Sequence, residues 1–169
     1  MRLYVRNKVV SLGGSSYVCD ERGNKVLQVQ GKVFSFTHKK HICDLQGNRL
    51  FTVRNKFISF PLPKAFILDA NGQKIAMLRK QKFFSFHKSF FVEGVADDIR
   101  IEGDVIGWKF AVFKNGVQIA FVQRSWETAA DLFRDAYVLD VVDEWHAAFA
   151  VALVVAIDNY FDDLEDSHD

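Results

Sequence analysis

A stretch near the C-terminus, residues 142–161, constrains the fold more than any other part of the chain. No polar side chain occurs over the eleven residues 147–157, and five of them are alanine. This length and composition favour a helix over a buried strand. A helix that is apolar on every side must be buried on every side. A membrane span needs about 20 residues, so a buried core helix is the first interpretation and a membrane-associated helix is the alternative.

The boundaries and the buried face of this helix are also predicted. Asp143 can cap the first turn and Glu144 complements the helix dipole, so we expect a helix over about residues 143–160. Ala152 lies at its centre and is expected to be fully buried. Trp145 and Phe149 are expected to plug one end of whatever encloses the helix.

The chain before the helix contains a repeat, in residues 17–36, 41–60 and 66–86, with a looser fourth copy at 110–121. Each of the first three copies has a short apolar strand, a turn that begins with Asp and ends with Gly three residues later, and an alternating strand. Asp can bond its own backbone and Gly supplies a positive φ, so these turns predict β-hairpins. Asn115-Gly116 is the strongest hairpin signal in the chain.

Further short strands follow the third copy, which brings the total to about a dozen. Antiparallel strands in this number can surround the helix if they close into a barrel, and closure removes exposed edges. The fold class is therefore α+β and mainly β, with a barrel of about 12 antiparallel strands around a central C-terminal helix. We expect one domain over residues 1–161, followed by a frayed acidic tail at 162–169.

The formal net charge of +1 conceals a strong asymmetry along the chain. Residues 1–90 carry 17 Lys and Arg against four acids, a net of +13, whereas residues 91–169 carry five against 17, a net of −12. One interpretation is an electropositive face with an anionic partner. The other is that the halves neutralise each other inside one domain, because a barrel is expected to interleave them.

The first three repeats share a Lys-x-x-Ser-Phe ending, which places lysines at equivalent positions, and further basic residues follow these endings. The candidate lipid- or anion-binding residues are Lys32, Lys39, Lys40, Lys56, Lys82 and Lys88. Together they could contact phosphate head groups or a nucleic-acid backbone. The alternative is a solvated face whose lysines protect strand edges from pairing. Nucleic acid is the weaker partner, because the aromatic residues alternate inward and form no evident stacking platform.

Other site chemistry has little support in the sequence. We find no Gly-rich phosphate loop, nucleophile elbow or zinc-hydrolase motif, so no catalytic residues are assigned. The His and Cys spacing matches no zinc site, and no metal or cofactor is expected. Cys19 and Cys43 are interpreted as buried free thiols in a reducing cytoplasm. The basic N-terminus precedes no apolar run of signal-peptide length.

Together these features resemble the LURP-one-related family. The resemblance rests on the Asp-x-x-Gly hairpins, the Lys-x-x-Ser-Phe endings and a C-terminal Ala/Val/Ile helix ending in Ile157-Asp158, and it covers roughly residues 1–161. The family is similar in fold to the Tubby C-terminal domain and to phospholipid scramblases. This implies a 12-stranded barrel around a hydrophobic helix and brings no catalytic residues. Tubby-like members bind phosphoinositides through basic side chains, but no such site is transferred to particular residues of this chain.

The leading functional hypothesis is a non-enzymatic cytoplasmic module, with or without peripheral attachment to a membrane, that contacts anionic phospholipid or phosphoinositide surfaces through a basic face. The alternative is a structural or protein-interaction scaffold whose charged halves pair with another chain. Neither hypothesis fixes the oligomeric state.

Overall fold

The computed structural model of the chain describes residues 1–6, 15–31, 39–56, 64–80, 90–125 and 136–166, without the side chains of residues 15, 56, 80, 90, 91 and 162–166. These residues form β-strands and one α-helix. In chain order they are β1 (Arg2–Arg6), β2 (Ser15–Asp20), β3 (Lys25–Gly31), β4 (Lys40–Cys43), β5 (Arg49–Lys56), β6 (Lys64–Leu68), β7 (Lys74–Lys80), β8 (Phe90–Gly94), β9 (Ile99–Asp104), β10 (Lys109–Lys114), β11 (Val117–Ser125), β12 (Ala136–Val141) and α1 (Glu144–Asp166).

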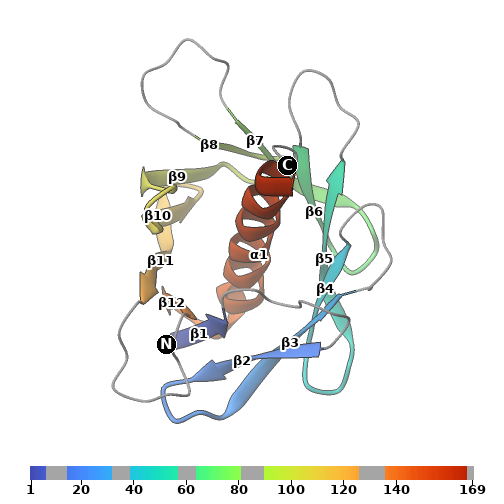
Figure 1. The fold of residues 1–169 in the computed structure, drawn as a ribbon, viewed down its shortest axis with the longest axis vertical. Coiled ribbons are helices and arrows are strands. Elements are labelled where there is room, and N and C mark those ends of the chain that lie inside the picture. The colour runs from blue at the N-terminus through green and yellow to red at the C-terminus, as the bar shows by residue number, and fades with distance from the viewer. Residues whose placement is uncertain (7–14, 32–38, 57–63, 81–89, 126–135, 167–169) are drawn as a thin grey trace.

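The strands form one antiparallel sheet that curls into a nearly closed barrel around α1 (Figure 1). Its order is β8-β7-β6-β5-β4-β3-β2-β1-β12-β11-β10-β9, so the first strand of the chain pairs with the last. The two ends of this order, β8 and β9, are consecutive in the chain and are joined by residues 95–98. The predicted fold class, a barrel of about 12 antiparallel strands around the C-terminal helix, is confirmed.

The hairpin turns occur where the repeats predict them. Gly23, Gly47 and Gly72 all have φ between 81° and 88°, a region that favours glycine. Asn115 and Gly116 both have positive φ, as a type I′ hairpin requires. In each of the three Asp-Gly hairpins the pairing register also shifts by one residue just before the turn. The sequence repeat is therefore repeated in backbone geometry.

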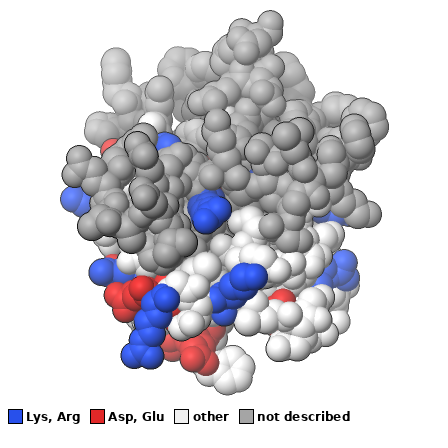
Figure 2. All heavy atoms as spheres, turned by 60° about the horizontal axis from the view of Figure 1, so that its bottom comes forward, with Lys and Arg blue, Asp and Glu red and all other residues white. Residues whose placement is uncertain are grey.

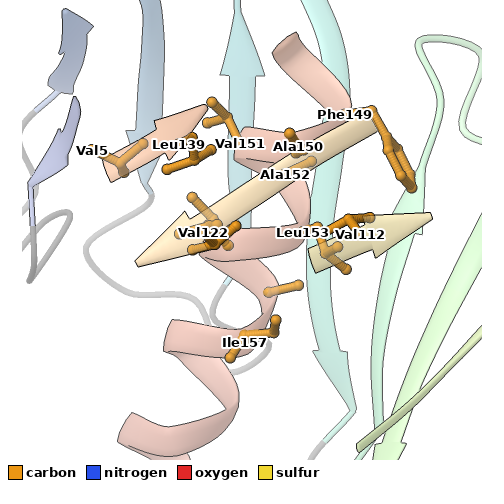
Figure 3. Close-up of a cluster of buried hydrophobic side chains, with 14 of the residues drawn as sticks. Val5, Val112, Val122, Leu139, Phe149, Ala150, Val151, Ala152, Leu153 and Ile157 are labelled. Carbon is orange, nitrogen blue, oxygen red and sulfur yellow. The ribbon is translucent and has the colours of Figure 1, made fainter. Parts of the chain in front are cut away.

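The helix α1 forms the core of the barrel. All residues from 147 to 160 are buried, and Ala152 is fully buried, as predicted. Leu153 and its neighbours pack against inward-facing valines and leucines of the sheet (Figure 3). Burying one such side chain contributes roughly 1.5–3 kcal/mol. In the described part of the chain, no helix combines the length and the apolarity that crossing a membrane requires.

Two details of the helix differ from the prediction. It begins one residue later than expected and continues to Asp166, so part of the predicted acidic tail is helical. Phe149 is buried and its ring lies edge-on to Phe51, with centroids 6.0 Å apart. Trp145 does not plug the barrel, because its side chain is 91% exposed. It lies in the first helical turn, before the helix becomes buried at Ala147.

Candidate anion-binding surface

The antiparallel order gives the barrel two rims with different character. We call one the turn rim, because it carries the hairpin turns β2–β3, β4–β5, β6–β7 and β10–β11, together with the start of α1. We call the other the loop rim. Here β3, β5, β7 and β11 end, β4, β6, β8 and β12 begin, and the turn at residues 105–108 joins β9 to β10.

The helix runs from the turn rim to the loop rim. Its first residue follows β12 at the turn rim. Near its other end, Phe161 lies beside Trp108 of the β9–β10 turn, with ring centroids 6.0 Å apart. Asp158 accepts a hydrogen bond from Tyr137, the second residue of β12. The C-terminal part of the helix therefore lies at the loop rim.

Three of the six predicted lysines, Lys39, Lys40 and Lys56, belong to the described residues. Lys39 and Lys40 lie at the start of β4, on the loop rim, and both side chains are partly buried. Lys56 is the last residue of β5 and so lies on the same rim, although its side chain is outside the described residues. The remaining three predicted residues, Lys32, Lys82 and Lys88, lie outside the described residues. The Ser-Phe endings of the three repeats do so as well.

Described strand ends flank those three lysines in the sequence. Gly31 ends β3 one residue before Lys32, Lys80 ends β7, and Phe90 begins β8. All three strand ends belong to the loop rim. The topology therefore directs the chain on either side of Lys32, Lys82 and Lys88 to the rim that holds Lys39 and Lys40.

The strand order separates the two charged halves of the chain. The expectation that a barrel would interleave them is wrong, because β1 to β7 form one continuous arc and β9 to β12 form another. We call these the basic arc and the acidic arc. The reason is the meander topology: consecutive strands are neighbours, so charge that is segregated in the sequence stays segregated around the barrel.

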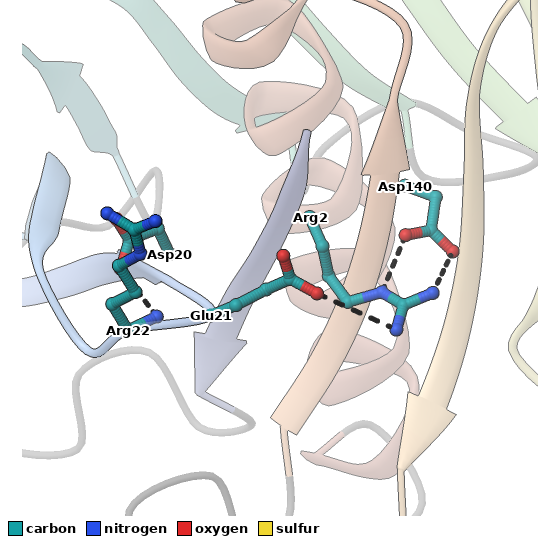
Figure 4. Close-up of polar contacts among 5 residues, drawn as sticks. All are labelled: Arg2, Asp20, Glu21, Arg22 and Asp140. Carbon is teal, nitrogen blue, oxygen red and sulfur yellow. Dashed lines mark hydrogen bonds and ion pairs between the residues drawn. The ribbon is translucent and has the colours of Figure 1, made fainter.

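Two described ion pairs join the halves where the arcs meet. At the β1–β12 boundary, Arg2 donates to both carboxylate oxygens of Asp140, with Nε–Oδ1 2.7 Å and Nη2–Oδ2 3.0 Å (Figure 4). The hydrogen bond from Arg2 to Asp140 raises the pKa of the guanidinium. At the β7–β8 boundary, Arg79 pairs with Glu93. Neutralisation between halves is thus seen at the two boundaries.

In Figure 2, the coloured part of one face shows blue and red side chains side by side. This view alone therefore presents no uninterrupted basic surface among the coloured residues. The charge separation is a property of the strand order and is not visible as one blue patch from this direction.

The carboxylates of the Asp-Gly turns hold the turns together. Asp20 Oδ1 accepts hydrogen bonds from the backbone N–H groups of Arg22 and Asn24, at 2.9 and 2.8 Å, and the Asn24 amide donates to Oδ2. Asp44 is bonded in the same way by Asn48. The side-chain amides are the main reason that the pKa of each of these two carboxyls lies below its ordinary value.

Two carboxylates in the segment 95–108, Asp97 and Asp104, have a similar role. Asp97 accepts from Asn115 and forms an ion pair with Lys114, both at 2.9 Å. Hydrogen bonds from Lys114 and then Asn115 lower the pKa of Asp97. Asp104 accepts from the N–H of Gly107 in the β9–β10 turn. Both carboxylates therefore hold turns in place.

The cysteines and the metal candidates give no site in the described part of the chain. Cys43 is buried, as predicted, and burial raises the pKa of its thiol. Cys19 is only partly buried. Among the described residues, no group of three or more His, Cys, Asp or Glu side chains is placed to hold a metal ion.

A polar layer that we did not predict lies inside the core near the loop rim. Asn55, Asp158 and Asn159 are all buried there, and the hydroxyl of Tyr137 donates to Asp158 Oδ1 at 2.6 Å. The Tyr137 ring stacks on Trp108, with centroids 4.0 Å apart. A signal was present, because Asp158 and Asn159 directly follow the apolar run, but we interpreted them as the end of the helix.

Comparison with known proteins supports the fold that the geometry shows. A family model described as LURP-one-related matches residues 1–158. A crystal structure of a protein from Arabidopsis thaliana superposes with a TM-score of 0.58 and 18% sequence identity, covering 94% of this chain and 89% of that one. At this identity the match shows a shared fold and no more. A search of curated proteins gives no match.

Proposed function

Because the chain belongs to the LURP-one-related family, whose resemblance to the Tubby fold suggests lipid contact, we propose that it is a non-enzymatic module that binds anionic phospholipid or phosphoinositide surfaces. The observation that carries the proposal is the continuity of the basic arc. In support of it, Lys39, Lys40 and Lys56 lie at strand ends of this arc that belong to the loop rim.

The arrangement suits a weak, multivalent contact with head groups. A basic side chain near an anionic bilayer contributes about 1 kcal/mol, and the attraction falls off within a Debye length of the surface. Several lysines therefore have to reach the bilayer together, which a single rim permits and a scattered distribution does not. In this proposal the protein acts in the cytoplasm and attaches peripherally to the inner leaflet.

Sedimentation with vesicles tests the proposal. Phosphatidylcholine vesicles with and without about 20% phosphatidylserine, or a few per cent phosphatidylinositol bisphosphate, are mixed with the protein over a salt series. We expect binding only to the anionic vesicles and weaker binding at high salt. Lys39→Gln, Lys40→Gln and Lys56→Gln combined should lower the affinity by more than about tenfold, given the contribution of each charge.

The chain offers matched controls at the opposite rim. Lys25 and Lys74 belong to the basic arc but lie at its turn rim, where their ammonium groups sit over the rings of Tyr17 and Phe66. Lys25→Gln with Lys74→Gln should leave vesicle binding nearly unchanged. Equal losses from both sets of variants would indicate attraction by overall charge and would reject the loop rim as the binding surface.

A further inference from the structure

The tryptophan at the start of the core helix is almost entirely exposed. Trp145 is 91% exposed, whereas the helix from residue 147 to residue 160 is buried. Its backbone position is firmly held: Asp143 Oδ1 accepts from the His146 N–H at 3.0 Å and contacts the His146 ring at 2.7 Å, which caps the helix. A large aromatic side chain on a rigid, capped turn loses little conformational freedom when a partner covers it.

Trp145 shares the turn rim with other exposed apolar residues. Val142 and Val117 are 57% and 63% exposed, and Met1 is 42% exposed. Backbone hydrogen bonds bring these segments together, since the Val142 N–H donates to Ile119 and Met1 bonds in both directions with Val141. We call Met1, Val117, Val142 and Trp145 the Trp145 patch. Tryptophan is the residue most typical of the centre of protein interfaces.

Two carboxylates lie beside the tryptophan of this patch. Asp143 and Glu144 adjoin Trp145 in the chain, and both side chains reach solvent. Of the cations in the adjoining segments, Arg2 is paired with Asp140 and Lys114 with Asp97, and the amino group of Met1 donates to the Val141 carbonyl. Carboxylates in this position repel an anionic bilayer and attract a basic partner.

We propose that the Trp145 patch is a docking site for a protein segment that carries lysine or arginine around an apolar anchor, such as one face of a basic amphipathic helix. The apolar anchor covers Trp145 and the two valines, and the basic side chains pair with Asp143 and Glu144. The site lies on the rim opposite to the proposed lipid contact and does not depend on that contact.

Fluorescence anisotropy with a defined peptide tests this. The probe is a labelled leucine–lysine peptide of about 18 residues, roughly five helical turns, with all leucines on one face. A leucine–glutamate peptide of the same pattern is its counterpart. We expect binding of the lysine peptide, and at least about tenfold weaker binding by Trp145→Ala, as for a central interface tryptophan. Glu144→Gln should weaken binding by a smaller factor, and the glutamate peptide should bind far more weakly than the lysine peptide.

Ile106→Ala is the matched control, since Ile106 is 42% exposed but lies in the β9–β10 turn at the loop rim. The Ile106→Ala variant should bind the lysine peptide as tightly as the unaltered protein does. Equal affinity of Trp145→Ala and Ile106→Ala would overturn the proposal. If the protein self-associates and Trp145→Ala abolishes this, the occupant is a second copy of the chain and the proposal is overturned. Vesicle binding that requires Trp145 would overturn the proposal as well. The peptide-binding result does not depend on whether the loop-rim lysine variants lose vesicle binding.

Discussion

The hydroxyl of Tyr137 donates a 2.6 Å hydrogen bond to Oδ1 of Asp158 inside the barrel, and this contact ties the last strand to the far end of the core helix. Tyr137 is 2% exposed and Asp158 is 5% exposed. In a medium of low dielectric, a carboxyl group depends on such donors, because water cannot replace them.

Tyr137→Phe should therefore destabilise the fold. The substitution keeps the ring that stacks on Trp108 and removes only the donor to Asp158. Removing one partner of a buried hydrogen bond costs about 1–3 kcal/mol, because the other partner is left unsatisfied, and we expect a loss of that size in the free energy of unfolding, measured by urea denaturation. Tyr17→Phe, at a 37% exposed position, is the control and should change stability by less than about 0.5 kcal/mol. Equal effects would mean that the Tyr137 hydroxyl contributes no net stability.

Ala152→Asp should prevent folding. Ala152 is fully buried at the centre of the helix, so the new carboxylate would be an unpaired charge in the core, with a cost of several kcal/mol. Circular dichroism and solubility of the purified variant measure the outcome. Trp145→Asp introduces the same side chain at the exposed start of the same helix and should fold normally. A soluble Ala152→Asp variant with a cooperative transition would contradict the central position of the helix.

The Asp-Gly turns should lose stability in acid. The folded-state pKa values of Asp20 and Asp44 lie below the ordinary aspartate value. Their contribution is therefore fully present above about pH 4, near the unfolded value, and is lost as the pH falls through the lower folded value. Asp20→Asn combined with Asp44→Asn should lower the melting temperature at pH 7, and the difference from the unaltered protein should shrink towards pH 2.

Melting curves over pH 2–7 measure this convergence. Glu21→Gln removes an acid from the same turn without touching these hydrogen bonds and serves as the control. If the difference in melting temperature between the double variant and the unaltered protein stayed constant over this pH range, the carboxylate charge would not matter for the turns.

The sequence was sufficient to predict the fold because each level of the pattern agreed with the others. The repeated Asp-Gly turns define antiparallel neighbours, and the run at residues 147–157 requires a complete apolar enclosure. Trp145 was misplaced because hydrophobicity alone does not say where along a helix the enclosure begins. That depends on how far the sheet extends past the first helical turn, which is a property of the assembled barrel.

The candidate site was less predictable for a different reason. Equivalence of Lys32, Lys56 and Lys82 in the repeat implies a shared rim but not the direction of each side chain. The separation of basic and acidic residues along the chain was visible in the sequence. Whether the two groups would also be separated around the barrel depended on the strand order. A meander keeps sequence neighbours together, and a barrel with crossover connections would have mixed them.

Opposite charges from the two arcs meet at the β1–β12 boundary. Arg2 and Asp140 are opposite each other in the β1–β12 register and form a two-point contact. Both side chains are about 40% exposed, with 42% for Arg2 and 39% for Asp140, so solvent screening limits the coupling energy to about 0.5–1 kcal/mol. A double-mutant cycle with Arg2→Met and Asp140→Asn, followed by urea denaturation, isolates this energy.

The Arg2–Asp140 coupling should stabilise the fold at low salt. It should fall towards zero in about 1 M sodium chloride, where charges are screened within about 3 Å. The same cycle between Arg2 and Glu102 is the control, since no described contact joins them, and it should give no coupling at either salt concentration. If the Arg2–Asp140 coupling survived high salt unchanged, hydrogen-bond geometry rather than charge would hold β1 to β12. The boundary would then not depend on the opposite charges of the two arcs.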